Sequence, residues 1–116
     1  MNLALLRGKL SSPPRLQTLP SGDELLALEV TIRREGNPAE SVPVAWPDPP
    51  EAAAGWPVGH EVVVVGRIRR RWFRAAQAAA SRTEVVAVAV VPASRRAAVA
   101  KAVDRALAEA VDLATP

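Results

Sequence analysis

Apolar and polar residues alternate along several short stretches of the chain, and a period of two is typical of β-strands with one buried face. The clearest stretch is 24–34, in which Leu26, Leu28, Val30 and Ile32 fall on one face. Other short apolar runs are bounded by Pro, Gly and charged residues, as strands commonly are. The pattern predicts five strands, at residues 2–10, 24–34, 41–46, 61–73 and 83–91.

The predicted strand at 61–73 changes character along its length. It starts with the four valines of 62–65, and a continuous apolar run predicts burial on both faces there. Farther along it is rich in arginine. By alternation, Ile68 and Trp72 share the core-facing side of Val64. The opposite face carries Arg67, Arg69, Arg71 and Phe73.

Two segments have the composition of helices. A short run at 51–54 lies between the third and fourth predicted strands. A longer segment covers 94–114, with Ser94 as a suitable N-cap and charged residues opposite an apolar stripe. This amphipathic helix must bury its stripe against its own domain or against another chain. The stripe consists of Val99, Val103, Ala106, Ala110 and Leu113.

Between the last two predicted strands, the small residues at 75–81 predict a connection.

Size and composition indicate one globular domain, with 116 residues of which 49% are hydrophobic and 23% charged. The chain has no Cys and one His, so we expect no disulfide, no metal site and no cofactor. No nucleophile or carboxylate pair accompanies His60, and we expect no enzymatic activity. Neither a membrane-length apolar segment nor a signal peptide is predicted, which favours a cytoplasmic location.

Positive charge is concentrated in one part of the sequence. The net charge is only +3, but the interval between Glu61 and Glu84 contains no acidic residue. Trp72 and Phe73 fall within it, and basic residues interleaved with aromatic ones suit a groove that follows a nucleic-acid backbone. The alternative is a solvated face of an arginine-rich protein. The arginines of this interval are Arg67, Arg69, Arg70, Arg71, Arg74 and Arg82.

The order of the predicted elements defines the expected fold. Five strands with a short helix between the third and fourth have the element order of an OB-fold, a small Greek-key barrel that binds oligonucleotides. We therefore expect a mainly β protein. A five-stranded OB-fold Greek-key barrel would cover residues 1–92, and a C-terminal amphipathic α-helix would cover 93–116.

Short motifs over residues 2–92 resemble, in order, those of the bacterial single-stranded DNA-binding protein family. Each motif is weak alone, and their common order makes the resemblance specific. They are Gly8-Lys9-Leu10 in the first strand, Leu19-Pro20-Ser21-Gly22 in the following turn, Val58-Gly59-His60-Glu61-Val62 at the start of the fourth strand, Gly66-Arg67-Ile68-Arg69-Arg70-Arg71-Trp72-Phe73 within it, and Arg82-Thr83-Glu84-Val85-Val86 in the fifth.

The resemblance implies sequence-nonspecific binding of single-stranded DNA, in replication, repair or recombination. Trp46 matches the aromatic residue that ends the family's third strand, and it would stack on bases together with Phe73 or Trp72. Trp56 falls where the family has an apolar packing residue. The family's aromatic residue near the end of the second strand is missing, and arginines stand in its place. The cations implied in phosphate contacts are Lys9, Arg33, Arg34, Arg67, Arg69, Arg71 and Arg74.

The end of the sequence departs from the family pattern. An amphipathic helix stands where the family has a flexible linker and an acidic tail, which indicates a divergent paralogue without that tail. The alternative function is an OB-fold protein-interaction or assembly module, similar to primosomal replication proteins, with weak or lost nucleic-acid binding. The resemblance also implies a homo-oligomer, dimer or tetramer, associated with the nucleoid. The C-terminal helix is then a candidate site for a protein partner.

Overall fold

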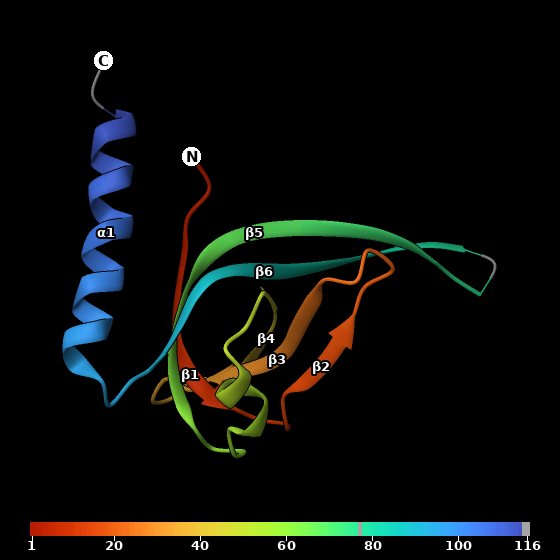
Figure 1. The fold of residues 1–116 in the computed structure, drawn as a ribbon, viewed down its shortest axis with the longest axis horizontal. Helices are drawn as coiled ribbons and strands as arrows, with labels where there is room; N and C mark the ends of the chain where they lie inside the picture. The colour runs from red at the N-terminus through yellow and green to blue at the C-terminus, as the bar shows by residue number, and fades with distance from the viewer. Residues whose placement is uncertain (77, 115–116) are drawn as a thin grey trace.

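The computed structural model describes residues 1–76 and 78–114, and its elements are mainly β-strands (Figure 1). In chain order they are β1 (Ala4–Leu10), β2 (Arg15–Thr18), β3 (Glu24–Ile32), β4 (Glu40–Pro47), the 3₁₀ helix η1 (Glu51–Gly55), β5 (Glu61–Ala75), β6 (Ala78–Pro92) and α1 (Arg96–Ala114).

The strands form one sheet that closes on itself. Its order is β1-β5-β6-β4-β3, and β1 pairs with β3 as well as with β5, which completes a ring of five strands. The pair of β4 and β6 is parallel, and the other pairs are antiparallel. The short helix lies between β4 and β5, as predicted. This arrangement is the expected OB-fold barrel followed by an α-helix.

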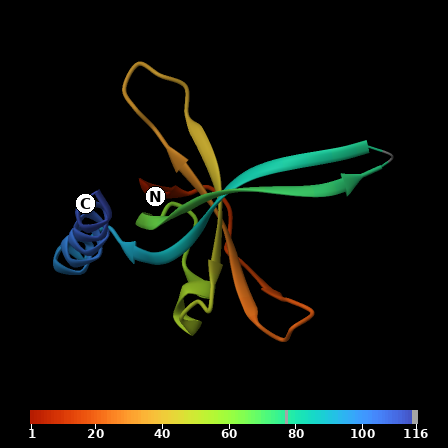
Figure 2. The ribbon, with the colours of Figure 1, turned by 90° about the horizontal axis from the view of Figure 1, so that it is seen from above.

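Strand β2 is an addition to the five strands that the sequence predicts. It pairs only with β3, at the edge of the sheet, and all of its residues are exposed. Because neither face of β2 is buried, its residues need not alternate, and the hydrophobic pattern carries no signal for it. The hairpin of β2 and β3 projects from the barrel (Figure 2).

Leucine and valine side chains fill the interior of the barrel. Leu26, Leu28 and Val30 point into it from β3, in the predicted alternation. Val62 and Val64 point into it from β5 and have no exposed surface. The core is therefore made mostly of small and branched side chains, with Trp46 as its aromatic member and Trp56 packed against it.

Helix α1 packs on the outer side of β5 and β6. Val65 alternates with the core-facing valines of β5, yet it is also buried, and it lines the same cleft as Ala102 and Ala106 of α1. Ala106 is buried and Val99, Val103 and Ala110 are half-buried, so the described part of the stripe packs in part on its own domain. The predicted burial on both faces of β5 is confirmed. The side chain of Leu113, the last member of the predicted stripe, lies outside the described part of the chain.

The N-cap of α1 differs from the prediction by one residue. Val99 N donates a hydrogen bond to Arg95 O at 3.0 Å, so Arg95 rather than Ser94 holds the N-cap position. In residues 1–76 and 78–114, no helix has the length and hydropathy that crossing a membrane requires.

Strands β5 and β6 continue beyond the barrel as a long hairpin (Figures 1 and 2). Their pairing runs from Val62 and Pro92 in the barrel to Ala75 and Ala78 at the tip. The predicted connection at 75–81 is therefore wrong for most of its length. This segment has no Gly, Pro or Asn to mark a turn, and small residues do not prevent strand pairing from extending over it.

Gly66 lies where the hairpin leaves the barrel. Val65 pairs with Ala89 and Gly66 with Ala87, so Val88 is an extra residue that forms a β-bulge in β6. A Cβ atom at position 66 would overlap the carbonyl oxygen of Val86. Only glycine permits this close approach of β5 to β6, and a bulge at such a point bends the paired strands.

Candidate nucleic-acid interface

The part of the hairpin outside the barrel has two faces, because successive side chains of a strand point to opposite sides. Residues directly opposite one another share a face, and the register places Glu84 opposite Arg69 and Arg82 opposite Arg71. We define the Glu84 face as Arg67, Arg69, Arg71, Phe73, Arg82 and Glu84. We define the Trp72 face as Ile68, Arg70, Trp72 and Arg74.

Both aromatic residues of the hairpin are exposed. Trp72 is 67% exposed and Phe73 is 43% exposed, and they lie on opposite faces. Alternation places Trp72 on the core-facing side of Val64 and leaves both Trp72 and Phe73 open as stacking residues, and the structure exposes both rings. Trp72 is on the same side of the strand as Val64, but outside the barrel that side faces solvent, and Ile68 is exposed for the same reason. The guanidinium of Arg70 lies 5.8 Å from the centroid of the Trp72 ring, in cation–π geometry.

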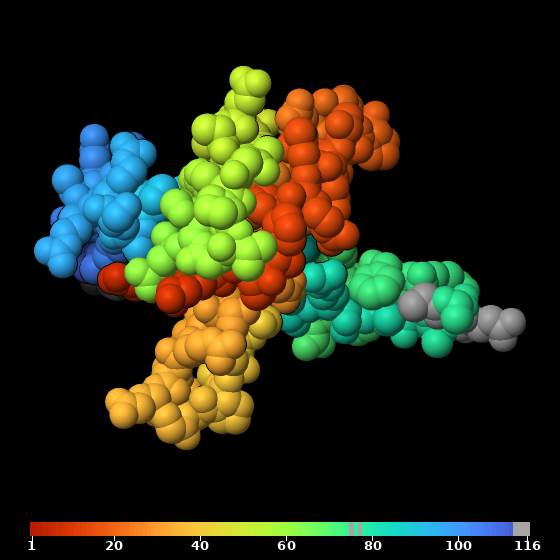
Figure 3. Space-filling model, turned by 90° about the horizontal axis from the view of Figure 1, so that it is seen from below, coloured from red at the N-terminus to blue at the C-terminus, as the bar shows by residue number. Residues whose placement is uncertain are grey.

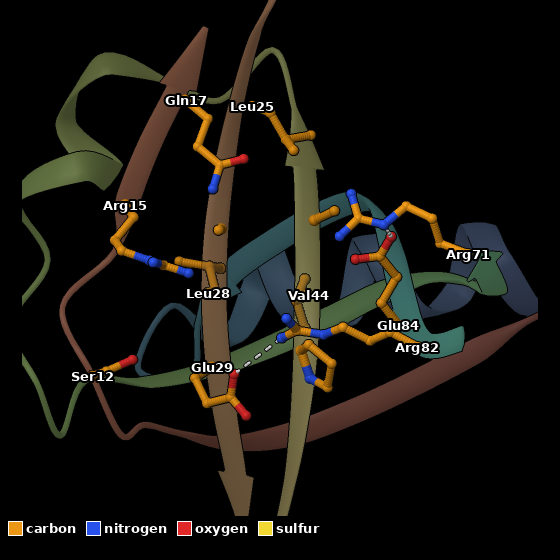
Figure 4. Close-up of a pocket in the computed structure, with 13 residues that line it drawn as sticks. Ser12, Arg15, Gln17, Leu25, Leu28, Glu29, Val44, Arg71, Arg82 and Glu84 are labelled. Carbon is orange, nitrogen blue, oxygen red and sulfur yellow. Dashed lines mark ion pairs between the residues drawn. The ribbon is translucent and has the colours of Figure 1, made fainter. Parts of the chain in front are cut away.

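Carboxylates pair with the arginines of the Glu84 face (Figure 4). Nη2 of Arg69 lies 2.6 Å from Oε1 of Glu84, and Nε of Arg71 lies 3.7 Å from the same oxygen. Glu84 is 5% exposed, and within the described residues it is the only charged residue that is buried. Arg82 Nη2 lies 3.8 Å from Oε2 of Glu29 on β3. Acidic partners therefore hold three guanidiniums of this face.

Three other arginines of the hairpin have no such partner. Arg67, Arg70 and Arg74 are exposed and form no ion pair with any residue that the structure describes. Arg70 is not among the cations predicted to contact phosphates, although it lies inside the acid-free interval, which is the signal that could have found it. Of these three arginines, Arg70 and Arg74 lie on the Trp72 face and Arg67 lies on the Glu84 face.

A groove lies between the Glu84 face and the outer side of β2, β3 and β4 (Figure 4). It contains a cavity of about 70 Å³ with Leu25 and Ala45 in its wall. Arg15 and Gln17 of β2 line one side of the groove, and Arg71 lines the other. Arg15 and Gln17 are absent from the sequence prediction because β2 itself carries no periodic signal.

The other predicted cations lie elsewhere. Lys9 and Arg33 line a second depression, of about 690 Å³, between β1 and the β3–β4 loop, and no described residue of the projecting hairpin lines it. Arg34 Nη2 lies 3.1 Å from Oε1 of Glu40 in an exposed ion pair. The β3–β4 loop and the β5–β6 hairpin project in different directions (Figure 3). The structure therefore divides the predicted cations into a hairpin group and a β1–β3 group.

Trp46, predicted to stack on bases, belongs to the core. It is 7% exposed, and its ring centroid lies 5.7 Å from that of Trp56. A base needs an accessible ring face on which to stack, and Trp46 does not offer one because Trp56 and the barrel cover it. Trp56 is partly buried against the core, as expected for a packing residue.

The described residues form no group of three or more His, Asp or Glu side chains that could hold a metal ion. His60 packs beside Trp56, with ring centroids 5.0 Å apart. Its Nε2 is buried without a hydrogen-bond partner among the described residues. The chemistry that the interface offers is therefore that of guanidinium groups and aromatic rings.

The closed five-stranded ring and the helix that follows it define an OB-fold protein. The fold is similar to that of the wild-type single-stranded DNA-binding protein from Thermus aquaticus, with a TM-score of 0.65 and 20% sequence identity. The similarity covers 79% of this chain and 40% of that chain, so this chain matches less than half of the Thermus protein. No family model and no curated protein sequence matches the chain.

Proposed function

We propose that this protein binds single-stranded DNA without sequence specificity, and that the β5–β6 hairpin is its main contact. The observation that supports this function best is the exposure of Trp72 and Phe73 in a hairpin rich in arginine. Trp72 shares its face with the exposed Ile68, and exposed large apolar groups mark interaction sites when they cluster. Aromatic side chains stack on any base, and each stacked base contributes about 1–3 kcal/mol to binding.

The phosphates of the strand would contact the guanidinium groups that lack acidic partners. Arg67, Arg70 and Arg74 meet this condition on the hairpin. Lys9 and Arg33 offer a second cationic surface on the barrel. With few aromatic residues on the surface, we expect electrostatic contacts to carry a large share of the affinity, which would then fall steeply with salt.

The similarity of the fold to a single-stranded DNA-binding protein, that of Thermus aquaticus, supports DNA as the ligand. On this proposal the protein is a non-enzymatic component of replication, repair or recombination. It needs no metal or cofactor, and it acts in the cytoplasm, at the nucleoid, where single strands are exposed.

Intrinsic tryptophan fluorescence tests the proposed function. The titrant is an oligo-dT of about 16 nucleotides, the upper end of the site size of one OB-fold. Trp46 is buried and Trp56 packs against it, so Trp72 is the accessible reporter. We expect quenching on binding, and an affinity that falls with salt on a log–log slope of about −0.7 per phosphate contacted.

The control for this titration is Trp72→Phe, in which an aromatic ring remains but the reporter is lost. This variant should bind a fluorescently labelled oligo-dT, followed by anisotropy, without a change in its own tryptophan emission. If the unmodified protein shows neither quenching nor an anisotropy change at low salt, the proposed function is wrong.

A second candidate function is a protein-interaction or assembly module. The observation that favours it is a cleft of about 440 Å³ between α1 and the barrel, lined by Ala102, Ala106 and the 71% exposed Val88. Such a surface suits an apolar segment of another chain, including a second copy in a dimer or tetramer. Light scattering measures the oligomeric state. A Val88→Glu variant that loses self-association but keeps oligo-dT binding would assign assembly to this cleft.

A further inference from the structure

We propose that Glu84 withholds Arg69 and Arg71 from phosphate contacts, so that a single strand follows the Trp72 face of the hairpin rather than the Glu84 face. The proposal rests on the proposed function and narrows it. On this path the strand contacts Trp72, Arg70 and Arg74, whereas Phe73 and Arg67 lie on the other face. Glu84 acts here as a positioning residue, because it contacts the competing arginines and not the nucleic acid.

The geometry of Glu84 makes it a strong competitor for these guanidiniums. Glu84 is 5% exposed, and its Oε1 accepts a hydrogen bond from Arg69 at 2.6 Å. Charge-assisted hydrogen bonds are stronger than neutral ones, and a buried carboxylate that loses its cation is strongly unfavourable. A phosphate that took Arg69 away would leave Glu84 with Arg71 alone, at 3.7 Å.

A phosphate that joined the pair without displacing it would meet a second difficulty. It would place its own negative charge beside the Glu84 carboxylate, and like charges at such short distances repel. Phosphate binding on this face therefore either breaks a buried ion pair or brings two anions together. The Arg82–Glu29 pair, at 3.8 Å, adds a second carboxylate to the same face.

The Trp72 face has neither difficulty. Arg70 and Arg74 flank Trp72 on one side of β5, and in the described residues neither has an acidic partner. Their cross-strand neighbours across β6 are Thr83 and Ala79, which are uncharged. A cation, an aromatic ring and a second cation in a row match the order of phosphate, base and phosphate along a single strand.

The experiment compares two arginines that are adjacent in sequence and lie on opposite faces. Binding of labelled oligo-dT is measured by anisotropy as a function of salt for the unmodified protein, Arg70→Ala and Arg69→Ala. Removing one phosphate contact should reduce the magnitude of the log–log salt slope by about 0.7. We expect this reduction for Arg70→Ala and a clearly smaller one for Arg69→Ala.

A second variant, Glu84→Gln, tests the role of the carboxylate directly. Glutamine keeps the size and the acceptor oxygen but removes the charge, so Arg69 and Arg71 become available to phosphates. The salt slope should steepen by about 0.7 for each guanidinium released. Adding Arg69→Ala to Glu84→Gln should then remove one such increment. Glu51→Gln, an exposed acid of η1, changes the net charge equally and should not steepen the slope in this way.

The outcomes separate this inference from the function on which it rests. If the unmodified protein does not bind at low salt, the proposed function fails and this inference fails with it. If it binds, but Arg69→Ala reduces the slope as much as Arg70→Ala, the strand does not prefer the Trp72 face. A Glu84→Gln slope equal to that of Glu51→Gln would also overturn the inference. Thermal melting of each variant shows that it is folded.

Discussion

The side chain of Asn2 forms two hydrogen bonds with the backbone of Ile68. Asn2 Nδ2 donates to Ile68 O at 2.6 Å, and Ile68 N donates to Asn2 Oδ1 at 2.9 Å. Ala4 pairs with Gly66, so Asn2 stands opposite Ile68, two positions farther along the β1–β5 ladder. There a side-chain amide, in place of the backbone amide, continues the hydrogen bonding of the ladder. The hairpin is thus anchored where it leaves the barrel.

The Asn2 anchor predicts a local change in hydrogen exchange. In Asn2→Ala, the Ile68 amide should exchange faster by up to about tenfold, because a hydrogen bond contributes about 0.5–1.5 kcal/mol net. Asn2→Asp keeps the acceptor and loses the donor, so its effect should be smaller. The control is Asn37→Ala, which removes a hydrogen bond to Glu35 O in the β3–β4 loop. Equal exchange at Ile68 in all variants would contradict the anchor.

The close approach of β5 to β6 predicts that position 66 accepts only glycine. In Gly66→Ala, the added Cβ meets the backbone carbonyl of Val86, which cannot move without disrupting the ladder. We expect the free energy of unfolding to fall by about 1–3 kcal/mol or more, measured by urea denaturation. Gly55→Ala is the matched control, because no atom lies within 4 Å of a Cβ there. Equal stability of the two variants would show that the barrel tolerates a side chain at the bend.

Local periodicity explains why so much of the barrel is predictable. Leu26, Leu28 and Val30 all point inward, and the alternation of apolar and polar residues on β3 predicts this burial. Strand β2 has no buried face, so no alternation of apolar and polar residues predicts it. The bulge at Val88 depends on a close approach between two strands, and alternation within one strand does not reveal it.

The candidate site was harder to predict because its exposure depends on where the barrel ends. Alternation places Trp72 on the side of Val64, but only the three-dimensional structure shows that this side is solvent beyond Gly66. The same limit applies to Trp46, whose position at the end of a strand leaves both stacking and packing open in the sequence. The Glu84–Arg69 pair requires the exact cross-strand register, which composition does not define.

The backbone at the hairpin tip predicts a stabilising substitution. Ala76 has φ of 53°, in the left-handed region that costs a residue with a Cβ about 1–2 kcal/mol. Ala76→Gly removes this cost, and the larger entropy of unfolded glycine offsets about 0.5–1 kcal/mol of the gain. We expect a small rise in melting temperature. Ala79→Gly, in β6 of the same hairpin, should lower the melting temperature instead, and a fall for both variants would contradict the strain at Ala76.

The different positions of Trp72 and Trp46 predict opposite effects of the same substitution. Trp72→Ala removes an exposed ring, so stability should stay within about 0.5 kcal/mol of the unmodified protein. Its affinity for labelled oligo-dT should fall by about 1–3 kcal/mol, the contribution of one stacked base. Trp46→Ala removes a buried ring and should cost about 3–5 kcal/mol of stability. Trp46→Phe restores most of the packing, and this variant should bind oligo-dT as the unmodified protein does. If Trp46→Phe weakened binding more than Trp72→Ala while remaining folded, the base would stack on β4 and not on the hairpin.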